Sequence, residues 1–176
     1  MNGFEIEKII SKFMCGCGSN FAGVFAADEI PERFAQYPVG YVINTDPRSL
    51  PGQHWVAYYH SSPNSNEFFD SYGNHLSTLS LKSYPQLKYN KYCFQELKSN
   101  VCGQYCIFYL YKRSKNFSLD YITKILSNAR TPDQFVAQFC KSLKLTHSII
   151  DCSCSDKNYQ CCTSRKNCTL SCVSQH

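Results

Sequence analysis

The sequence lacks the features that would make it a membrane or secreted protein. No stretch approaches the run of about 18 apolar residues that indicates a membrane-spanning helix. Residues 1–13 carry Glu5, Glu7 and Lys8 within an amphipathic pattern, whereas a secretory signal has a basic start followed by an apolar run. We therefore expect an intracellular protein of a reducing compartment, the cytoplasm or nucleus, with no membrane partner.

A disulfide framework is also not expected, although the chain has 12 cysteines among 176 residues. Reducing compartments keep thiols free, so these cysteines are interpreted as thiols or metal ligands. A strong excess of one charge is missing as well, because the net charge is only +5. Lysines at 82, 88, 91, 98, 112 and 115, with Arg113, either contact an acidic partner such as DNA or form a solvated face, and composition favours the solvated face.

The spacing of apolar residues predicts an α+β fold in which helices pack on a small, mainly antiparallel central sheet. Apolar residues recur at helical spacing over 4–13, which predicts an opening helix. Short aromatic and β-branched runs predict strands at 39–44, 54–59 and 67–70, and a fourth at 92–95. Helical spacing returns at 102–111, at 119–126 and after the start signal Thr131-Pro132-Asp133-Gln134. We expect residues 1–145 to form one monomeric domain.

The composition changes sharply in residues 146–176, which form a cysteine-rich tail. Its six cysteines are separated by Ser, Thr, Asn and Lys, with almost no large apolar residues, so the tail cannot form a core. None of their spacings is a standard Cys-x2-Cys zinc pair. A disordered tail is the favoured interpretation, a zinc site is the alternative, and no metal is expected to take part in chemistry.

Four residues in chain order match the parts of a cysteine hydrolase: His54, Asp70, Gln95 and Cys102. Cys102 precedes Gly103 at the start of an apolar helix, where exposed N–H groups lower a thiol pKa and glycine permits close approach. His54 would be the base, and Asp70 would orient it. Gln95 would join the Cys102 backbone N–H in the oxyanion hole.

Each of these residues also has a structural interpretation. Cys102 alone would be an ordinary buried cysteine, and Cys106, one turn further along the helix, is the rival thiol, which we assign to packing. Asp70 alone would be a turn residue, and Gln53 and Gln104 compete with Gln95 for the role of oxyanion donor. Trp55, next to His54, is expected to wall the substrate cleft.

The chain from about residue 4 to 145 resembles an adenovirus-type cysteine endopeptidase, or adenain, of the clan shared with the SUMO and ubiquitin-like-protein proteases. The motifs that carry the resemblance are Cys15-Gly16-Cys17, Phe21-Ala22-Gly23-Val24-Phe25, Ile43-Asn44-Thr45, His54-Trp55-Val56-Ala57, Phe69-Asp70-Ser71-Tyr72-Gly73, Gln95 and Cys102-Gly103-Gln104-Tyr105-Cys106. Similar proteases occur in viruses and in virus-derived mobile elements, so the resemblance allows such an origin and, for a virus, a place in the virion.

The resemblance implies peptide-bond cleavage after a small, glycine-containing motif, with no cofactor required for the chemistry. It places Asn44, Trp55 and Gly103 at the substrate cleft. It also allows activation by DNA or by a short peptide, although Tyr84 and Pro85 stand where adenains carry the cysteine that binds an activating peptide. Two alternatives stay open: a SUMO- or ubiquitin-like-protein-specific protease, and a catalytically inactive nucleic-acid-binding protein.

Overall fold

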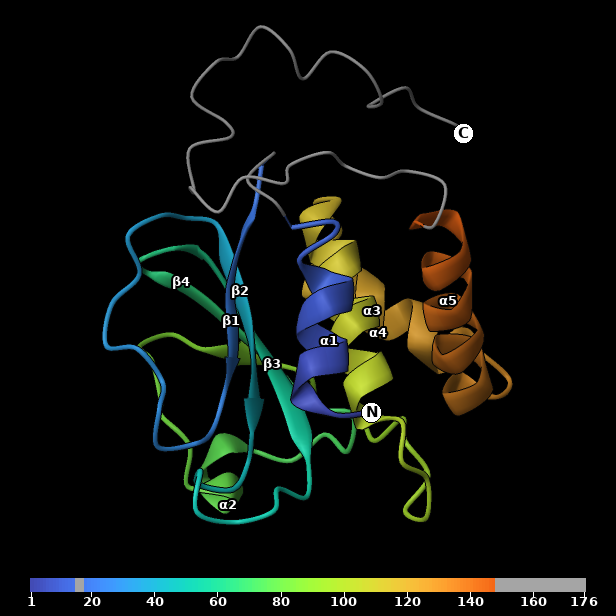
Figure 1. The fold of residues 1–176 in the computed structure, drawn as a ribbon, viewed down its shortest axis with the longest axis horizontal. Coiled ribbons are helices and arrows are strands. Elements are labelled where there is room, and N and C mark those ends of the chain that lie inside the picture. The colour runs from blue at the N-terminus through green and yellow to red at the C-terminus, as the bar shows by residue number, and fades with distance from the viewer. Residues whose placement is uncertain (15–17, 148–176) are drawn as a thin grey trace, which may run out of the picture.

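A computed structural model describes residues 1–14 and 18–147 of the chain. The cysteine-rich tail, apart from the last residues of a helix, lies outside the described residues. The fold is α+β, as the sequence predicts (Figure 1). Its helices are α1 (Gly3–Ile10), α2 (Leu76–Leu79), α3 (Cys102–Ser114), α4 (Leu119–Asn128) and α5 (Pro132–His147). Its strands are β1 (Asn20–Phe25), β2 (Val39–Asn44), β3 (Trp55–Ser62), β4 (Ser65–Phe69) and β5 (Lys88–Tyr89).

The strands form one mixed sheet in the order β1-β2-β3-β4-β5. The β2–β3 and β3–β4 pairs are antiparallel, whereas β1 and β5 join the two edges by parallel pairing. The expectation of a mainly antiparallel sheet is therefore corrected to a mixed one. Parallel neighbours need long connections, and these are supplied by the segments 26–38 and 70–87, the second of which includes α2.

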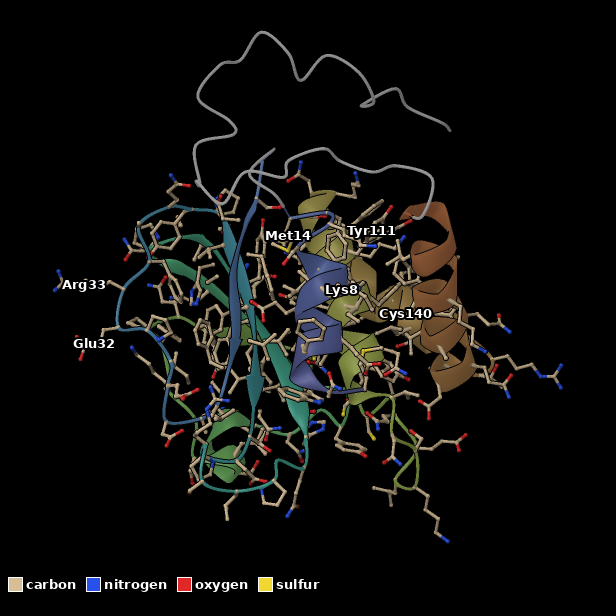
Figure 2. The ribbon with its side chains drawn as sticks, in the orientation of Figure 1. Lys8, Met14, Glu32, Arg33, Tyr111 and Cys140 are labelled. Carbon is tan, nitrogen blue, oxygen red and sulfur yellow. The ribbon has the colours of Figure 1, made fainter. Side chains whose placement is uncertain are left out.

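Helices cover one face of the sheet. α3 packs on β3, and α1 and α5 lie on either side of α3 (Figure 1). The core between these layers joins Val42, Ala57 and Phe69 of the strands to Tyr105 and Phe108 of α3. Figure 2 shows Met14, Tyr111 and Cys140 among the helices.

The other face of the sheet is covered by loops and by the short helix α2. Tyr41, Tyr58 and Phe68 point to this side and pack with Leu76 and Leu81. Because successive side chains of a strand point to opposite faces, β2 is buried on both sides, which explains its continuous apolar run. The 26–38 loop runs along this outer side, where Figure 2 shows Glu32 and Arg33 pointing outward.

The strand predicted at 92–95 is wrong, because the last strand of the sheet is β5 at Lys88–Tyr89. Residues 92–95 instead form a loop that is held against the end of β4. The backbone N–H groups of Phe94 and Gln95 both donate to the carbonyl of Ser71, over 2.8 and 3.1 Å. This loop leads towards the start of α3, and its attachment to Ser71 brings Gln95 next to the segment that carries Asp70.

Two negative findings apply to residues 1–14 and 18–147. Within these ranges, no helix has the length and apolar character needed to cross a membrane. The same ranges contain no cluster of three or more His, Cys, Asp or Glu side chains arranged to hold a metal ion.

Candidate active site

The topology brings three of the predicted site residues to one end of the sheet. His54 directly precedes β3, and Asp70 directly follows β4. Because β3 and β4 are antiparallel neighbours, the start of one lies beside the end of the other. Cys102 is the first residue of α3, the helix that packs on β3. An imidazole, a carboxylate and a thiol therefore meet although 48 residues of sequence separate His54 from Cys102.

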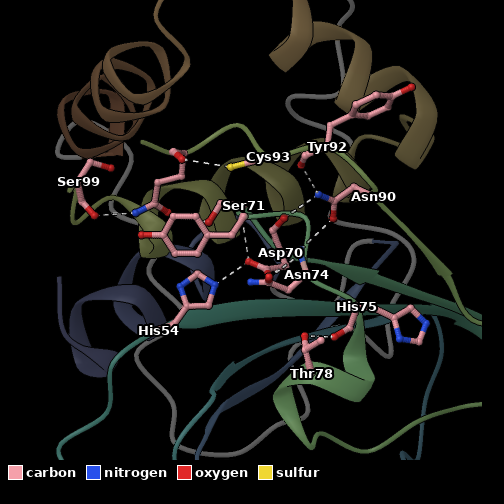
Figure 3. A network of polar contacts seen from close by, with 12 residues as sticks. His54, Asp70, Ser71, Asn74, His75, Thr78, Asn90, Tyr92, Cys93 and Ser99 are labelled. Carbon is pink, nitrogen blue, oxygen red and sulfur yellow. Dashed lines mark hydrogen bonds and ion pairs between the residues drawn. The ribbon is translucent and has the colours of Figure 1, made fainter. Parts of the chain in front are cut away.

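The imidazole of His54 is bonded to a fully buried carboxylate. Nε2 of His54 lies 2.6 Å from Oδ1 of Asp70, which is 0% exposed (Figure 3). The backbone N–H groups of Tyr72 and Asn74 donate to the two carboxylate oxygens over 3.0 and 3.1 Å. These bonds fix the plane of the carboxylate, and the carboxylate in turn fixes the plane of the imidazole. The other ring nitrogen, Nδ1, is left to face Cys102.

The electrostatics of the site favour a thiolate–imidazolium pair. Burial raises the pKa of the Cys102 thiol, but its hydrogen bond to His54 and backbone hydrogen bonds at Trp55 and Gly103 lower the pKa to below the ordinary 9.0. Burial lowers the pKa of His54, but its hydrogen bonds to Asp70 and Cys102 raise the pKa to about 9. Both shifts favour a proton on the imidazole over a proton on the sulfur, the state in which a cysteine is nucleophilic.

Cys106 lies in a different environment from Cys102. It is 1% exposed, in the core between the helices and the sheet. Burial raises the pKa of its thiol well above the ordinary value, and the charge of Cys102 raises this pKa further. A thiol in such a place stays protonated and packs as a small apolar group. Its surroundings agree with its assignment to packing.

Gln95 lies 3% exposed in the loop that approaches α3, with both ends of its amide bonded. The hydroxyl of Ser71 donates to Oε1 of Gln95 over 2.7 Å, and Nε2 donates to the carbonyl of Ser99 over 2.8 Å. Ser71 and Ser99 are drawn in Figure 3 with the same network of polar contacts as His54 and Asp70. Among the described residues, Ser99 takes one of the two N–H groups, so the other can serve a ligand.

The start of α5 supports the same loop. Oδ2 of Asp133 accepts the backbone N–H of Glu96 over 3.3 Å, and Oδ1 accepts the hydroxyl of Tyr105 over 2.8 Å. Tyr105 lies three residues after Cys102, at the end of the first turn of α3. Asp133 therefore ties the Gln95 loop to the helix that carries the thiol.

Three residues of this site were not found from the sequence: Ser71, Tyr72 and Asn90. Their roles depend on contacts between segments that are distant in the chain, and no local pattern reports such contacts. Tyr72 packs its ring against that of His54, with centroids 4.8 Å apart, and so covers the imidazole. The resemblance to adenains, in which Asp70, Ser71 and Tyr72 form one motif, was the only available signal for two of them.

Trp55 and Asn44 lie together at one side of His54. They are register partners on β3 and β2, and both line a cleft of about 570 Å³. The indole Nε1 of Trp55 donates to the carbonyl of Met1 over 3.3 Å, which joins the wall of the cleft to the start of α1. Phe4 and Leu50 also line the cleft and are largely exposed. The residues that line this cleft do not include His54, Asp70 or Cys102, so the assignment of Trp55 and Asn44 to a substrate cleft stays a prediction.

Gly103 is buried in the first turn of α3, on the side that faces α1. A Cβ atom at this position would approach Cδ1 of Ile6 to 3.0 Å and Sδ of Met1 to 3.4 Å. Because Gly103 has no side chain, α1 packs closely against the start of α3, where Cys102 lies.

Comparison with known proteins returns little. No protein-family model and no curated protein matches the sequence. Among solved structures, the chain is similar to the central domain of the uncharacterized Lpg1148 protein from Legionella pneumophila, with a TM-score of 0.47 and 14% sequence identity. That similarity covers 82% of this chain and 97% of the other.

Proposed function

We propose that this protein is a cysteine endopeptidase of the adenain-like type. The observation that carries the proposal is the 2.6 Å hydrogen bond between the buried Asp70 and His54, together with a thiol at the N-terminus of α3, Cys102, that lies close enough to His54 for each to shift the pKa of the other. A strand-end histidine and a helix-start thiol each have structural explanations alone. Together, with a raised imidazole pKa and a lowered thiol pKa, they have the arrangement of an activated nucleophile.

In the first half of the proposed reaction, the thiolate of Cys102 attacks the scissile carbonyl carbon. The electron pair of the C=O bond moves to oxygen, and this oxyanion accepts hydrogen bonds from the backbone N–H of Cys102 and the free N–H of Gln95. The imidazolium of His54 then donates its proton to the leaving amine. The C–N bond breaks, the amine product leaves, and the acyl group remains on sulfur.

In the second half, His54 is neutral and acts as a general base. It takes a proton from water while the water oxygen attacks the thioester carbon. Collapse of the second oxyanion breaks the C–S bond and releases the carboxylic acid product. The proton held by His54 then faces a thiolate again, which restores the starting ion pair. Asp70 keeps the imidazole oriented through both halves.

The cleft beside Trp55, the residue that follows His54, is proposed to hold part of the substrate. Its apolar wall includes Phe4, Leu50 and Trp55, and its polar wall includes Asn44 and Arg48. The resemblance to adenains implies that the enzyme prefers substrates with glycine next to the scissile bond. The same chemistry on a folded ubiquitin-like protein is the alternative that the experiment must separate.

The test is labelling of the full chain by a peptide that ends in Gly-Gly with a carbonyl-directed electrophile, followed by mapping of the modified cysteine. We expect modification at Cys102 and cleavage of a matched Gly-Gly fluorogenic peptide. The exposed Cys93 provides the control, as Cys93→Ser, because its side chain donates to the carbonyl of Gln95 over 3.4 Å and a hydroxyl can keep that bond. Labelling at Cys93 alone, with no peptide cleavage, would refute the proposal. Cleavage of a ubiquitin-like protein but of no peptide would favour the alternative.

A further inference from the structure

We propose that Ser71 is a positioning residue that holds the amide of Gln95 in the one orientation able to stabilise an oxyanion. This inference rests on the proposed function and goes beyond it, since neither a charge nor a motif marks Ser71 for this role. Ser71 is 1% exposed and follows directly after Asp70.

The orientation of the Gln95 amide follows from the chemistry of its two partners. The oxygen and nitrogen of an amide are similar in shape, so their assignment must come from the hydrogen bonds. The Ser99 partner is a backbone carbonyl, which can only accept, so the amide atom facing it is Nε2. The atom facing Ser71 is then Oε1, and the Ser71 hydroxyl must donate its proton to it.

The orientation matters because a turned amide would oppose the reaction. With Nε2 held as it is, its second N–H is a donor available to a developing negative charge. If the amide turned over, Oε1 would face that charge and would also lie against the carbonyl of Ser99. The hydroxyl of Ser71 favours the productive orientation, since Oε1 is buried and has no other hydrogen-bond donor among the described residues.

Ser71 also fixes where the amide lies, through its main chain. Its carbonyl accepts the backbone N–H groups of Phe94 and Gln95, so the same residue holds both the backbone and the side chain of the oxyanion donor. The preceding residue, Asp70, holds His54. Two adjacent residues thus align the two halves of the site, the acid–base half through Asp70 and the oxyanion half through Ser71.

The variant that tests this is Ser71→Ala, which removes the hydroxyl and leaves the backbone contacts. We expect kcat for a Gly-Gly peptide to fall about tenfold with little change in KM, less than the roughly hundredfold or greater loss when an oxyanion donor itself is removed. Alkylation of Cys102 by iodoacetamide forms no oxyanion, so its rate and pH profile should stay as in the wild type. Ser71→Thr, which keeps a hydroxyl, should restore kcat to within a few-fold.

Ser114→Ala is the matched control. Its hydroxyl also donates over 2.7 Å, but to the carbonyl of Tyr111 at the far end of α3. This variant should leave kcat and KM unchanged. If Ser71→Ala does not fold, Ser71→Cys takes its place, because a thiol fills similar space and is a weaker donor.

Two results would overturn the inference while leaving the proposed function intact. One is a Ser71→Ala enzyme with wild-type kcat. The other is a Ser71→Ala enzyme that loses alkylation of Cys102 together with kcat, which would mean that Ser71 supports the thiol and base instead.

A readout independent of activity separates failure of the inference from failure of the function. The side-chain amide of Gln95 should give a sharp, ordered signal in NMR of the wild type and of Ser114→Ala. Its order parameter should fall in Ser71→Ala. If the wild type cleaves no substrate, a fall still supports the positioning role of Ser71, and an unchanged order parameter overturns it.

Discussion

Asn90 brackets the backbone of Asp70 on both sides. Its Oδ1 accepts the N–H of Asp70 over 2.9 Å, and its Nδ2 donates to the carbonyl of Asp70 over 2.6 Å (Figure 3). Asn90 is 3% exposed, and it follows directly after β5. Its side chain therefore imitates the strand partner that Asp70 lacks at the end of β4, and keeps the carboxylate in register with His54.

Asn90→Ala is expected to lower the free energy of unfolding by about 2 kcal/mol. The substitution leaves the buried N–H of Asp70 without its partner, which costs about 1–3 kcal/mol, whereas the carbonyl of Asp70 keeps the N–H of Gly73 over 2.9 Å. The measurement is urea denaturation followed by circular dichroism. Asn64→Ala, in the exposed turn between β3 and β4, should change stability by less than about 0.5 kcal/mol. Equal stability of the two variants would contradict the bracketing role of Asn90.

Asp70→Asn is expected to lower kcat/KM on the order of a hundredfold and to shift its dependence on pH. In the wild type, His54 carries the proton for the leaving group up to its pKa of about 9, so kcat/KM should fall above that pH. The hydrogen bond to Asp70 is the largest cause that raises this pKa. The amide introduced by the substitution is neutral and cannot favour imidazolium in the same way, so the alkaline fall should move to lower pH.

The pH profile of peptide hydrolysis between about pH 5 and pH 10 checks this expectation. This range includes both the ordinary histidine pKa of about 6.5 and the raised pKa of His54 of about 9. The acidic side of the profile reports formation of the Cys102 thiolate, and its midpoint should lie below the ordinary thiol pKa of 9.0. An alkaline fall at the same pH in both proteins would mean that Asp70 does not set the pKa of His54.

The sequence predicts most of the elements that bear the site. The aromatic and β-branched runs predict strands at 54–59 and 67–70 that begin at His54 and end at Asp70, within one residue of the observed ends of β3 and β4, and helical spacing starts α3 at Cys102. These are local patterns, set by which side chains face the core, and the structure confirms them. Together they were sufficient to nominate the thiol, the base and the carboxylate.

The edges of the sheet and the support of the site could not be predicted in the same way. β1 and β5 pair in parallel with strands that lie far away in the chain, and β5 has only two residues. Ser71 and Gln95 are 24 residues apart, and Asp70 and Asn90 are 20 apart. Hydrogen bonds between residues so far apart in the chain form only once the fold brings them together, so no local sequence pattern predicts them.

Cys102→Ala and His54→Ala are each expected to lower peptide hydrolysis by more than about a thousandfold while the protein stays folded. The thiol and the base act as one unit, so loss of either removes most of the rate. Cys106→Ala should retain hydrolysis, with a modest loss of stability because the side chain is buried. Progress curves with a fluorogenic peptide and thermal unfolding provide the two measurements. A folded, inactive Cys106→Ala enzyme with Cys102 intact would reverse the assignment of the nucleophile.

Three of the basic side chains that the sequence offers to a polyanion make contacts within the protein: Lys82, Lys112 and Arg113. Nε of Arg113 lies 3.0 Å from the carboxylate of Glu67, and Nζ of Lys82 donates to the carbonyl of Pro31 over 3.3 Å. The ammonium group of Lys112 lies 5.6 Å from the ring centre of Phe108 and 5.0 Å from that of Phe117. These contacts leave less free positive charge for a polyanion than the sequence alone indicates.

We therefore expect peptide hydrolysis to be the same with and without duplex DNA, in contrast to the activation that the adenain resemblance allows. Binding of DNA through lysines releases counterions, so a real DNA track would accelerate hydrolysis at low salt and lose that effect as salt rises. The assay compares rates with and without DNA at low and at physiological ionic strength. Acceleration at low salt that is abolished by Lys88→Ala with Lys91→Ala, two exposed lysines at and just after β5, would show a functional DNA surface. Equal rates in all conditions would indicate that these lysines only keep an aromatic-rich protein soluble.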